Sequence, residues 1–496
     1  MDRRRRTVAP RLSIVAHHAL DVCFDIDLAA DLGDVAMRCG CSVATLVDLL
    51  CGASLTVERI GFLPGFPYLS GLPEVLHLPR RDEPRPSVPA GSVALANGQA
   101  GIYPTSSPGG WHLVGRTPAR MFDVLRTPPS LLLPDDTVQF RAISRVAFDA
   151  AMQTAPPTRS MAAPDARVLR IVRPGAQTTV EDGGRPGYDA YGVADGGVSD
   201  RAAMQLANAL VGNALDAAVL ECTLAGPTFT CTEPLLLAVT GADAAVHVDD
   251  APVPCHPAIA VPAGATVQIG RCLRGARTIV AIGGGIDVPL VLGSRSTHRL
   301  SGFGGFEGRA LQVDDLLPLG APSPRTEARR QRPPRRALSR DLLGAPLHGR
   351  EPHALRFVPG EAWTAISADA QRLLLGDGHA ARLAPDSDRM GIRLDTPLPG
   401  GIHDPLAGMR PSVPVQRGTI QLPPGGVPII LGADHQTTGG YAILGTLIDA
   451  DHATLAQLRP GDAVRLSAID DTEAAQLNAK RTRHLAMALA ALHLPD

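Results

Sequence analysis

The same short pattern occurs near residue 140 and near the end of the chain, and it limits the folds that the chain can adopt. Residues 134–143 read Pro-Asp-Asp-Thr-Val-Gln-Phe-Arg-Ala-Ile, and residues 460–469 read Pro-Gly-Asp-Ala-Val-Arg-Leu-Ser-Ala-Ile. Each is typical of a tight turn that leads into an alternating strand. Residues 314–319 match more weakly, and residues 88–93 and 261–266 share the pattern Val-Pro-Ala-Gly. Three β units of about 120–150 residues fit this spacing, with coincidence of common turns as the alternative.

Composition agrees with a mainly β fold that has many turns. The 496 residues include 51 glycines and 45 prolines. The combined share of glycine and proline lies above the ~12% of an average chain and below the ~25–30% that indicates disorder. With 45% hydrophobic residues, the chain can also fill real cores.

Few helices are expected. One is predicted over residues 200–211, with Ser199 as its cap. A second is predicted to begin at Ser42 or Thr45 and to be short. A third is predicted over residues 471–496, because Asp470 and Glu473 form an Asp-x-x-Glu capping pattern at its start. This last helix either docks a partner or a second copy of the chain, or packs against its own domain.

Two segments have the composition of linkers. Residues 150–165 are rich in Ala, Pro, Thr and Ser, and residues 321–340 contain the basic run 329–336. That run has two interpretations: a contact with an anion or RNA, or a solvated connector that prolines interrupt.

The lysine content excludes several cofactor sites. Lys480 is the only lysine, and it lies in a helix-like stretch without glycines. A Walker phosphate loop needs Gly-Lys-Ser/Thr, so this ATP site is excluded. A covalently attached biotin needs a lysine in a tight turn, so no covalent biotin is expected on this chain. Schiff-base chemistry would depend on the same lysine and is not expected.

Charge and cysteine usage indicate a cytoplasmic protein. The net charge of −2 excludes nucleic-acid binding through bulk charge. No apolar run reaches the ~20 residues of a membrane span, and no secretory signal is recognised. We therefore expect the eight cysteines to be reduced thiols. Residues 39–41, Cys-Gly-Cys, are interpreted as small buried residues rather than a metal site.

The strongest local signal lies in residues 61–118, where Gly and Pro set the backbone shape around aromatic and arginine side chains. The alternative interpretation is an ordered loop of a β-barrel without a ligand. The side chains suited to chemistry are Phe66 and Trp111 as pocket walls, Arg81, Arg85 and Arg116 as partners of a carboxylate or phosphate, and His112 as an acid or base.

These motifs resemble a known family. Residues 61–69 (Gly-Phe-Leu-Pro-Gly-Phe-Pro-Tyr-Leu) and 107–118 (Ser-Pro-Gly-Gly-Trp-His-Leu-Val-Gly-Arg-Thr-Pro) resemble the B-type subunit of 5-oxoprolinase, the Kip kinase-inhibitor family, and subdomains C and D of the urea carboxylase carboxyltransferase domain. The second half resembles the C-type subunit, with subdomains A and B, in residues 180–188 (Val-Glu-Asp-Gly-Gly-Arg-Pro-Gly-Tyr) and 434–441 (Asp-His-Gln-Thr-Thr-Gly-Gly-Tyr). The resemblance covers roughly residues 20–145 and 168–470.

The resemblance implies tandem cyclophilin-like β-barrels, one in the first half and two in the second, with a few short helices. It also implies ATP-dependent hydrolysis of the lactam 5-oxoproline to L-glutamate, together with a separate A-type subunit of 5-oxoprolinase. ATP and Mg²⁺ are expected to bind largely to that partner. The predicted domains are residues 1–149 (a C and D domain like that of the B-type subunit), 150–167 (linker), 168–320 (first barrel of an A and B domain like that of the C-type subunit), 321–350 (linker), 351–470 (its second barrel) and 471–496 (C-terminal helix).

The first half departs from the family at several positions. The B-type subunit usually carries an additional N-terminal domain, which precedes the barrel, and almost nothing precedes it here. The family's Leu-His-Ser reads Leu49-Leu50-Cys51, so the role of that histidine is lost. In the second half, Ala442 replaces the usual proline after Gly-Gly-Tyr. We therefore expect the second half to be the intact part.

Lactam hydrolysis needs an acid or base, a cation for the carboxylate and a cradle for anions. The predicted catalytic residues are Asp434, His435, Asp182 and His112. The predicted substrate-binding residues are Arg185, Tyr188, Arg295, Gln436, Thr437, Gly439, Gly440 and Tyr441 in the second half, and Phe66, Tyr68, Gly109, Gly110, Trp111 and Arg116 in the first. No metal ligands are predicted.

Alternatives remain for several of these side chains. Asp182 also suits a turn-capping carboxylate, and Arg295 and Arg389 suit ion pairs that hold two barrels together. If Asp434 and His435 lie on one strand, they point to opposite faces, and only one enters a pocket.

Three functions fit the sequence. The first is the amidase component of a 5-oxoprolinase, with the A-type subunit and a small acidic substrate as partners. The second is a carboxyltransferase that acts on carboxybiotin delivered by another chain. The third is a binder without catalysis that inhibits a sensor kinase. A homo-oligomer is left open, and neither a nucleic-acid nor a membrane partner is expected.

Overall fold

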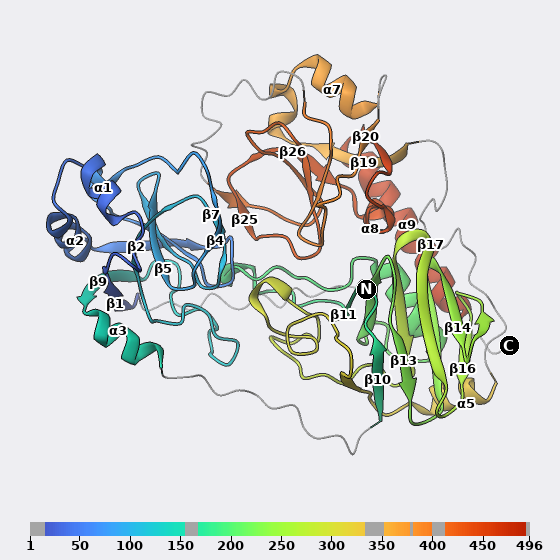
Figure 1. Ribbon diagram of the computed structural model, residues 1–496. Helices are drawn as coiled ribbons and strands as arrows, with labels where there is room; N and C mark the ends of the chain where they lie inside the picture. The colour runs from blue at the N-terminus through green and yellow to red at the C-terminus, as the bar shows by residue number, and fades with distance from the viewer. Residues whose placement is uncertain (1–14, 154–166, 333–351, 377–379, 399–411, 493–496) are drawn as a thin grey trace. The chain divides into compact units, whose positions relative to one another are not determined.

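The computed structural model describes residues 15–153, 167–332, 352–376, 380–398 and 412–492. The chain divides into two compact units, which we call the first unit and the second unit (Figure 1). The first unit comprises residues 1–161, 186–194 and 436–439, and the second comprises residues 162–185, 195–435 and 440–496.

The first unit is built on a closed barrel of seven strands, coloured blue to teal in Figure 1. The strand order is β1-β8-β5-β6-β3-β2-β9, and β1 closes the barrel by parallel pairing with β9. Buried and exposed residues alternate along β2 (Leu55–Ile60), as expected for a strand with one face in the core. The other strands are β1 (His17–Cys23), β3 (Pro67–Ser70), β5 (Ser92–Ala96), β6 (Gln99–Ile102), β8 (His112–Arg116) and β9 (Thr137–Ile143).

Short helices and a two-stranded ribbon complete the first unit. Helix α2 (Val43–Gly52) begins at Ser42, whose Oγ accepts a hydrogen bond from the Thr45 amide at 3.1 Å. This decides between the two predicted starts in favour of Ser42. The remaining elements are α1 (Leu32–Arg38), α3 (Arg145–Met152), η1 (Glu74–Leu76), η2 (Asp189–Tyr191), the ribbon of β4 (Arg85–Val88) and β7 (Ser107–Gly109), and β25 (Thr438–Gly439).

The second unit contains two sheets. The first has nine strands, and its centre is the long antiparallel pair of β14 (Leu235–Val248) and β17 (Thr266–Ile282). Along the sheet the order is β11-β12-β17-β13-β10-β18, with β15 and β16 paired to β14. The bounds are β10 (Val168–Arg173), β11 (Gln177–Glu181), β12 (Val219–Thr223), β13 (Thr228–Cys231), β15 (Ala251–Val253), β16 (Ala258–Val261) and β18 (Leu316–Pro318).

The other sheet of the second unit has seven strands in the order β20-β27-β19-β26-β23-β24-β21, drawn in orange and red in Figure 1. Its strands are β19 (His353–Pro359), β20 (Ala381–Arg382), β21 (Gly391–Arg393), β23 (Thr419–Leu422), β24 (Ile429–Leu431), β26 (Ala442–Leu447) and β27 (Ala463–Ala468). Outside it lie β22 (Val413–Pro414), η3 (Arg299–Ser301), η4 (Glu361–Ala365), η5 (Asp449–Asp451), α7 (Ala368–Leu375) and α8 (His452–Gln457).

Helix α4 (Arg201–Val211) corrects one predicted cap. Asp200, not Ser199, is the cap, because its carboxylate accepts a hydrogen bond from the Ala203 amide at 3.0 Å. The hydroxyl of Ser199 instead donates a hydrogen bond to the buried carboxylate of Glu221 at 2.8 Å. The helix ends at Gly212, which has a φ of 80°, a backbone conformation that favours glycine.

The C-terminal helix α9 (Asp471–Ala491) packs against its own unit. Asp470 caps it by accepting from the Glu473 amide at 2.8 Å. Ala488 and Leu492 are buried in one hydrophobic cluster with residues of α4. Of the two interpretations of this tail, the structure therefore shows the internal one.

The mainly β architecture and the three β units are confirmed. The repeated turn patterns lead into β9, β18 and β27, as predicted. Gly91 and Gly264, which share the Val-Pro-Ala-Gly pattern, adopt φ angles of 81° and 76° before β5 and β17. The units fit tandem cyclophilin-like barrels, of which the first is closed and the other two are open half-barrels.

Two arginines of the basic run, Arg329 and Arg330, bind groups within the fold. Helix α5 (Pro324–Gln331) occupies the start of the segment predicted as a linker. Arg329 donates to the Leu210 carbonyl at 2.9 Å, near the end of α4, and Arg330 pairs with Glu327 at 2.8 Å. These two arginines are thus committed within the fold, and residues 333–336 lie outside the described residues.

All eight cysteines are free thiols. Within the described ranges, no single helix is long and apolar enough to span a membrane; α1 and α2 reach that hydropathy together, with a 92° bend between them.

Candidate functional site

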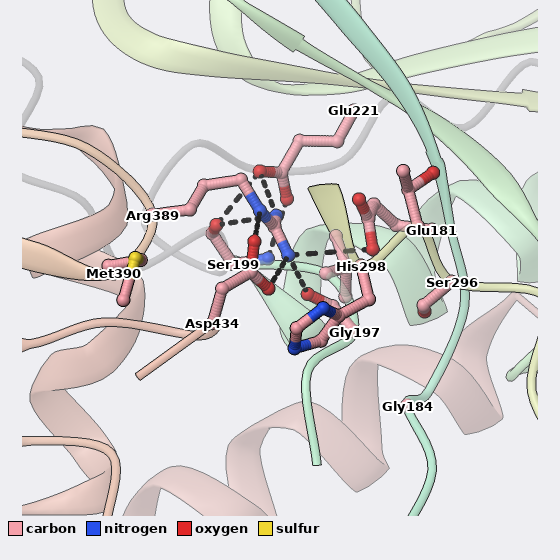
Figure 2. A network of polar contacts seen from close by, with 12 residues as sticks. Glu181, Gly184, Gly197, Ser199, Glu221, Ser296, His298, Arg389, Met390 and Asp434 are labelled. Carbon is pink, nitrogen blue, oxygen red and sulfur yellow. Dashed lines mark hydrogen bonds and ion pairs between the residues drawn. The ribbon is translucent and has the colours of Figure 1, made fainter. Parts of the chain in front are cut away.

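A buried arginine, Arg389, is the centre of a polar network in the second unit (Figure 2). Its Nε and Nη2 donate to the two carboxylate oxygens of Asp434, both at 2.8 Å. Its Nη1 donates to Oε1 of Glu221 at 2.6 Å. The guanidinium therefore binds one carboxylate at two points and a second at one, which is its strongest mode of recognition.

Further groups complete this Arg389 network. Nη2 donates to the Gly197 carbonyl at 2.7 Å, and Nη1 donates to the Ser199 hydroxyl at 3.2 Å. Oε2 of Glu181 lies 3.4 Å from Nη2. Three carboxylates thus surround one guanidinium, and Arg389 links the two sheets of the second unit. This matches the interpretation of Arg389 as an ion pair between barrels.

Strand pairing places two of the carboxylates on one face. Glu181 ends β11 opposite Val219, and Glu221 lies in β12 opposite Thr179. Residues two apart on a strand share a face, so the two glutamates lie diagonally on the same side of the sheet. Ser199 holds Glu221 in place, because its amide donates at 2.6 Å and its hydroxyl at 2.8 Å.

Two loops of the other sheet carry Arg389 and Asp434. The amide of Asp434 donates to the Arg389 carbonyl at 2.9 Å, and the amide of Gly432 donates to the Met390 carbonyl at 2.9 Å. A Cβ at Gly432 would lie only 2.2 Å from the Arg389 carbonyl oxygen. Glycine is therefore required here so that the two loops can approach each other.

Burial and neighbouring charge set the protonation states. Burial works against the charged form of Glu221, but Arg389 and Arg277 outweigh it and lower the pKa of that carboxyl. Burial likewise opposes the charge of Asp434, and Arg389 lowers its pKa as well. Despite its own burial, Arg389 has its pKa raised well above the usual value by Asp434, Glu181 and Glu221.

Glu181 differs from the other two carboxylates. It is fully buried, and apart from the ion pair to Arg389 neither of its oxygens meets hydrogen-bond geometry with a described group. Burial raises the pKa of Glu181 well above its ordinary value, and the nearby charges of Asp434 and Glu221 add to this against the attraction of Arg389. Glu181 is therefore the carboxyl of this site that retains its proton to the highest pH.

Arg185 is a second buried group with unused hydrogen-bonding capacity. Its Nη2 donates to the Ser296 carbonyl, and its guanidinium lies 5.2 Å from the ring centre of Phe303. Nε and Nη1 are buried and meet no hydrogen-bond acceptor among the described residues. The pKa of Arg185 is lowered by burial, against the attraction of Glu181 and Asp182.

His298 adds a neutral imidazole to the site. Its ring stacks on Phe303 with 4.7 Å between centroids and an interplanar angle of 3°. Burial lowers its pKa to about 4, with Asp434 opposing and Arg185 reinforcing the effect. Nδ1 accepts a hydrogen bond from the Ser301 amide at 3.3 Å, so the neutral ring carries its proton on Nε2.

Asp182 anchors the loop that carries Arg185. Its Oδ1 accepts from the hydroxyls of Ser294 at 2.6 Å and Ser296 at 2.7 Å and from the Gly184 amide at 2.8 Å. Its Oδ2 accepts from the Arg295 amide at 2.6 Å. These four donors correspond to the turn-capping interpretation, and the predicted catalytic role of Asp182 stays a prediction.

The side chain of Arg295 bonds to residues of its own segment, which lies between β17 and β18. It donates to Asp287 at 2.6 Å and to the Val288 carbonyl at 2.8 Å. The predicted ion pair between barrels is therefore absent for Arg295 among the described residues. Its predicted role in substrate binding is untested by this geometry.

His435 lies beside a different group from Asp434. It is buried, and with Arg417 and Arg201 it adds to the burial that lowers the pKa of His452 to about 3. Asp434 and His435 lie between β24 and β25 rather than on a strand, so the condition for opposite faces is not met, and the predicted role of His435 stays a prediction. In the same segment, Gly440 belongs to the second unit and Tyr441 is 39% exposed.

The predicted aromatic walls of the first unit form part of its core. The Phe66 ring lies 5.0 Å from that of Tyr68 and 5.9 Å from that of Trp111, and all three are buried. A Cβ at Gly109 would lie 2.2 Å from the hydroxyl of Tyr103, which fills the space beside it. These rings therefore pack against each other.

The remaining predicted residues belong to the first unit, whereas the Arg389 network belongs to the second. His112 is buried, with Nε2 3.0 Å from the Pro79 carbonyl oxygen. Tyr188 packs on Tyr191 at 6.1 Å. The others are Gly110, Arg116, Gln436, Thr437 and Gly439.

The second unit brings together Asp434, Asp182 and Arg185 from the predicted set. The residues predicted for the site from the sequence do not include Glu181, Glu221, Ser199 or His298. One signal in the sequence could have indicated Glu221. It is a charged residue between the apolar run Ala-Ala-Val-Leu and Cys222, and a charge inside an apolar strand is costly unless it has a partner.

Comparisons with known proteins agree with this architecture. The family model described as "Carboxyltransferase domain, subdomain A and B" matches residues 191–468, and the one described as "Carboxyltransferase domain, subdomain C and D" matches residues 5–132.

Relatives match each half of the chain. The C-type subunit of 5-oxoprolinase from Escherichia coli K12 is 32% identical over 326 residues, which are 66% of this chain and 99% of that protein. The B-type subunit of 5-oxoprolinase from Escherichia coli O157:H7 is 51% identical over 110 residues, which are 22% of this chain and half of that relative's length. The crystal structure of TTHA0988 is 32% identical, covers 91% of this chain and 85% of its own, and has a TM-score of 0.76.

Proposed function

Because this chain belongs to the carboxyltransferase-domain family of subdomains A and B, we propose that it is the part of a 5-oxoprolinase in which the B-type and C-type subunits are joined. In this proposal it hydrolyses the lactam 5-oxoproline to L-glutamate together with a separate A-type subunit. The names of the relatives that match each half support this assignment.

The observation that carries the proposal is that a buried carboxyl, Glu181, belongs to the Arg389 network and that its charge acts on a second buried group, Arg185. Glu181 is a buried carboxyl with an elevated pKa, and Arg185 has two N–H groups without an acceptor among the described residues. A lactam presents a carbonyl oxygen that accepts hydrogen bonds and a ring nitrogen that must gain a proton. The two side chains are complementary to these two groups.

In the proposed reaction, water adds to the carbonyl carbon and the ring C–N bond breaks. Arg185 stabilises the negative charge that develops on the carbonyl oxygen. Glu181 gives its proton to the leaving nitrogen, since its elevated pKa keeps it protonated as a general acid requires, and it regains a proton from the added water. The carboxylic acid that forms then passes its proton to the released amine, which gives the carboxylate and ammonium groups of glutamate.

ATP and Mg²⁺ are assigned to the A-type partner in this proposal. The single lysine, Lys480, lies in helix α9 and far in sequence from any glycine loop. Within the described parts of the chain, no three His, Cys, Asp or Glu side chains are grouped to hold a metal ion. No step on this chain is assigned to these groups.

The direct test combines the full-length chain with an A-type subunit of 5-oxoprolinase, ATP, Mg²⁺ and 5-oxoproline, and measures glutamate. We expect glutamate formation, and at least a ~100-fold loss for Glu181→Gln. Arg170→Gln is the control, because Arg170 is exposed and lies outside the site. His435→Gln tests the predicted role of that side chain in the same assay. A folded, assembled pair that forms no glutamate would defeat the proposal.

A second candidate is transfer of a carboxyl group from carboxybiotin held by another chain. The description of the matching family as a carboxyltransferase domain favours it. The two candidates differ in their requirements, because only this one needs a biotinylated partner. Carboxylation of an amide substrate by the full-length chain with carboxybiotin, without glutamate formation from 5-oxoproline, would select it.

A further inference from the structure

The first unit contains a cavity that the proposed reaction does not use. Its volume is about 180 Å³, and it lies where residues 27–30, the β4 strand and the end of β8 meet. Ser92 and Leu113 are buried residues that line it. At ~30 Å³ per water, this volume accommodates about six waters or a small organic molecule.

The guanidinium of Arg116 lines this cavity and is held in place by a hydrogen bond from its Nε. Its Nε donates to the Ala90 carbonyl at 2.8 Å, and its guanidinium carbon lies 5.8 Å from the ring centre of Phe148. Its Nη1 and Nη2 make no hydrogen bond with a described group. A guanidinium held by Nε leaves its two terminal nitrogens in the geometry that binds a carboxylate at two points.

The neighbouring arginine, Arg85, is already occupied. Its Nη1 and Nη2 donate to the two oxygens of Asp31 at 2.9 and 2.7 Å. Arg81 donates to the same carboxylate at 3.0 Å, and so does the Leu113 amide at 2.7 Å. Of the three arginines that the sequence suggested as anion partners, the structure thus leaves Arg116 for a ligand.

The local charge favours an anion. One carboxylate, Asp31, faces the two cations Arg81 and Arg85. Burial and the charge of Arg145 lower the pKa of Arg116, so a bound anion would relieve this repulsion. Arg145 pairs with Asp149 at 2.9 Å and lies 3.9 and 3.8 Å from Asp25 and Asp27. Among the described residues that line the cavity itself, Asp27 is the one acidic side chain, against the two cations Arg85 and Arg116.

We propose that this cavity binds a small organic carboxylate, with the carboxylate on Nη1 and Nη2 of Arg116 and the hydrocarbon part on Leu113 and Pro89. The cavity is lined by residues of the first unit, and the proposal does not rest on the proposed reaction. Inorganic phosphate is the competing occupant, but an apolar lining such as Leu28 and Leu113 offers phosphate nothing. Five-carbon acids have the size that the cavity accommodates.

The test measures binding of glutarate to the full-length chain by calorimetry. Glutaramide, which has the same carbon chain without charge, and inorganic phosphate are the comparison ligands. We expect glutarate to bind at least tenfold more tightly than either. Arg116→Gln should weaken glutarate binding at least tenfold. Arg116→Lys should weaken it less, because lysine keeps the positive charge but cannot bind a carboxylate at two points.

Two matched variants locate the binding. Arg120→Gln removes an exposed arginine of the same unit that pairs with Asp123, and Glu181→Gln changes the Arg389 network; both should leave glutarate affinity unchanged. Melting temperatures check that each variant is folded. The proposal is overturned if Arg116→Gln and Arg116→Lys bind glutarate as the unaltered chain does, if phosphate binds more tightly than glutarate, or if glutarate does not bind.

Discussion

Arg389 and Asp434 form a two-point ion pair, with both nitrogen–oxygen distances at 2.8 Å, and the backbones that carry them are hydrogen-bonded to each other. The same guanidinium reaches Glu221 on the other sheet of the second unit. One side chain thus joins two sheets and sets the charge of a buried site.

Arg389→Met should destabilise the chain strongly. It leaves Glu221 and Asp434 buried without their main partner, and breaking a buried pair in this way costs about 3–5 kcal/mol. Chemical denaturation of the full-length protein measures the loss, and Arg170→Gln, on the exposed surface, should change the free energy of unfolding by less than about 0.5 kcal/mol. Equal effects of the two substitutions would show that the network adds no stability.

Glu181→Gln should stabilise the protein progressively as the pH rises. The pKa of Glu181 is raised in the folded state, so its carboxyl contributes stability below the unfolded pKa near 4.5 and loses it as pH rises toward the folded pKa. Glutamine keeps the shape and removes the titration. Glu221→Gln is the counterpart: since the pKa of Glu221 is lowered, the substitution should destabilise above pH 4.5. Melting temperatures of both variants and of the unaltered chain, measured between pH 5 and 9, test these expectations. A Glu181→Gln protein that is less stable than the unaltered chain at pH 9 would contradict the raised pKa of Glu181.

Protonation of His298 should lower the free energy of unfolding in mild acid. Its pKa is lowered from 6.5 to about 4, so its contribution is present above pH 6.5 and is lost as pH falls through 4. The loss amounts to about 3 kcal/mol at 1.36 kcal/mol per pKa unit. His298→Asn should flatten the stability profile between pH 6.5 and 4.5, whereas His484→Asn, at an exposed position of α9, should not. Parallel profiles for all three proteins would refute this.

Gly432→Ala should displace the loop of Arg389. The added methyl group would lie 2.2 Å from the Arg389 carbonyl oxygen, which is backbone and must shift. We expect a loss of about 1–3 kcal/mol and of glutamate formation in the reconstituted system. Gly425→Ala is the matched control, because nothing lies within 4 Å of a Cβ there. An active, fully stable Gly432→Ala protein would mean that the two loops separate without consequence.

The sequence predicted the local features of the fold well. The recurrent turns before residues 137, 316 and 463 precede strands, and the capping signals at Ser42 and Asp470 start helices. These features depend on residues a few positions apart. The one misplaced cap, Ser199 for Asp200, arose because both residues suit a helix start and a distant carboxylate, Glu221, binds Ser199.

The candidate site was only partly predictable. Asp434, Asp182 and Arg185 stood in recognisable motifs, whereas Glu181 and Glu221 did not draw attention as partners of Arg389. The contacts join residues that are distant in the sequence, such as Glu221 with Arg389, 168 residues later. The aromatic residues near position 66 were expected to wall a pocket; the structure shows them buried and packed against each other, and their role as pocket walls stays a prediction.

By itself, the sequence determined the β-rich class, the three repeated units, the helix starts and the absence of a lysine suited to phosphate or biotin. These follow from turn chemistry, alternation and composition, which are local or additive. Only the tertiary structure decided which charges meet. Burial and the approach of separate strands and loops make Glu181 a carboxyl that keeps its proton and Asp434 one that gives it up, since the pKa of each depends on neighbours that the order of residues does not reveal.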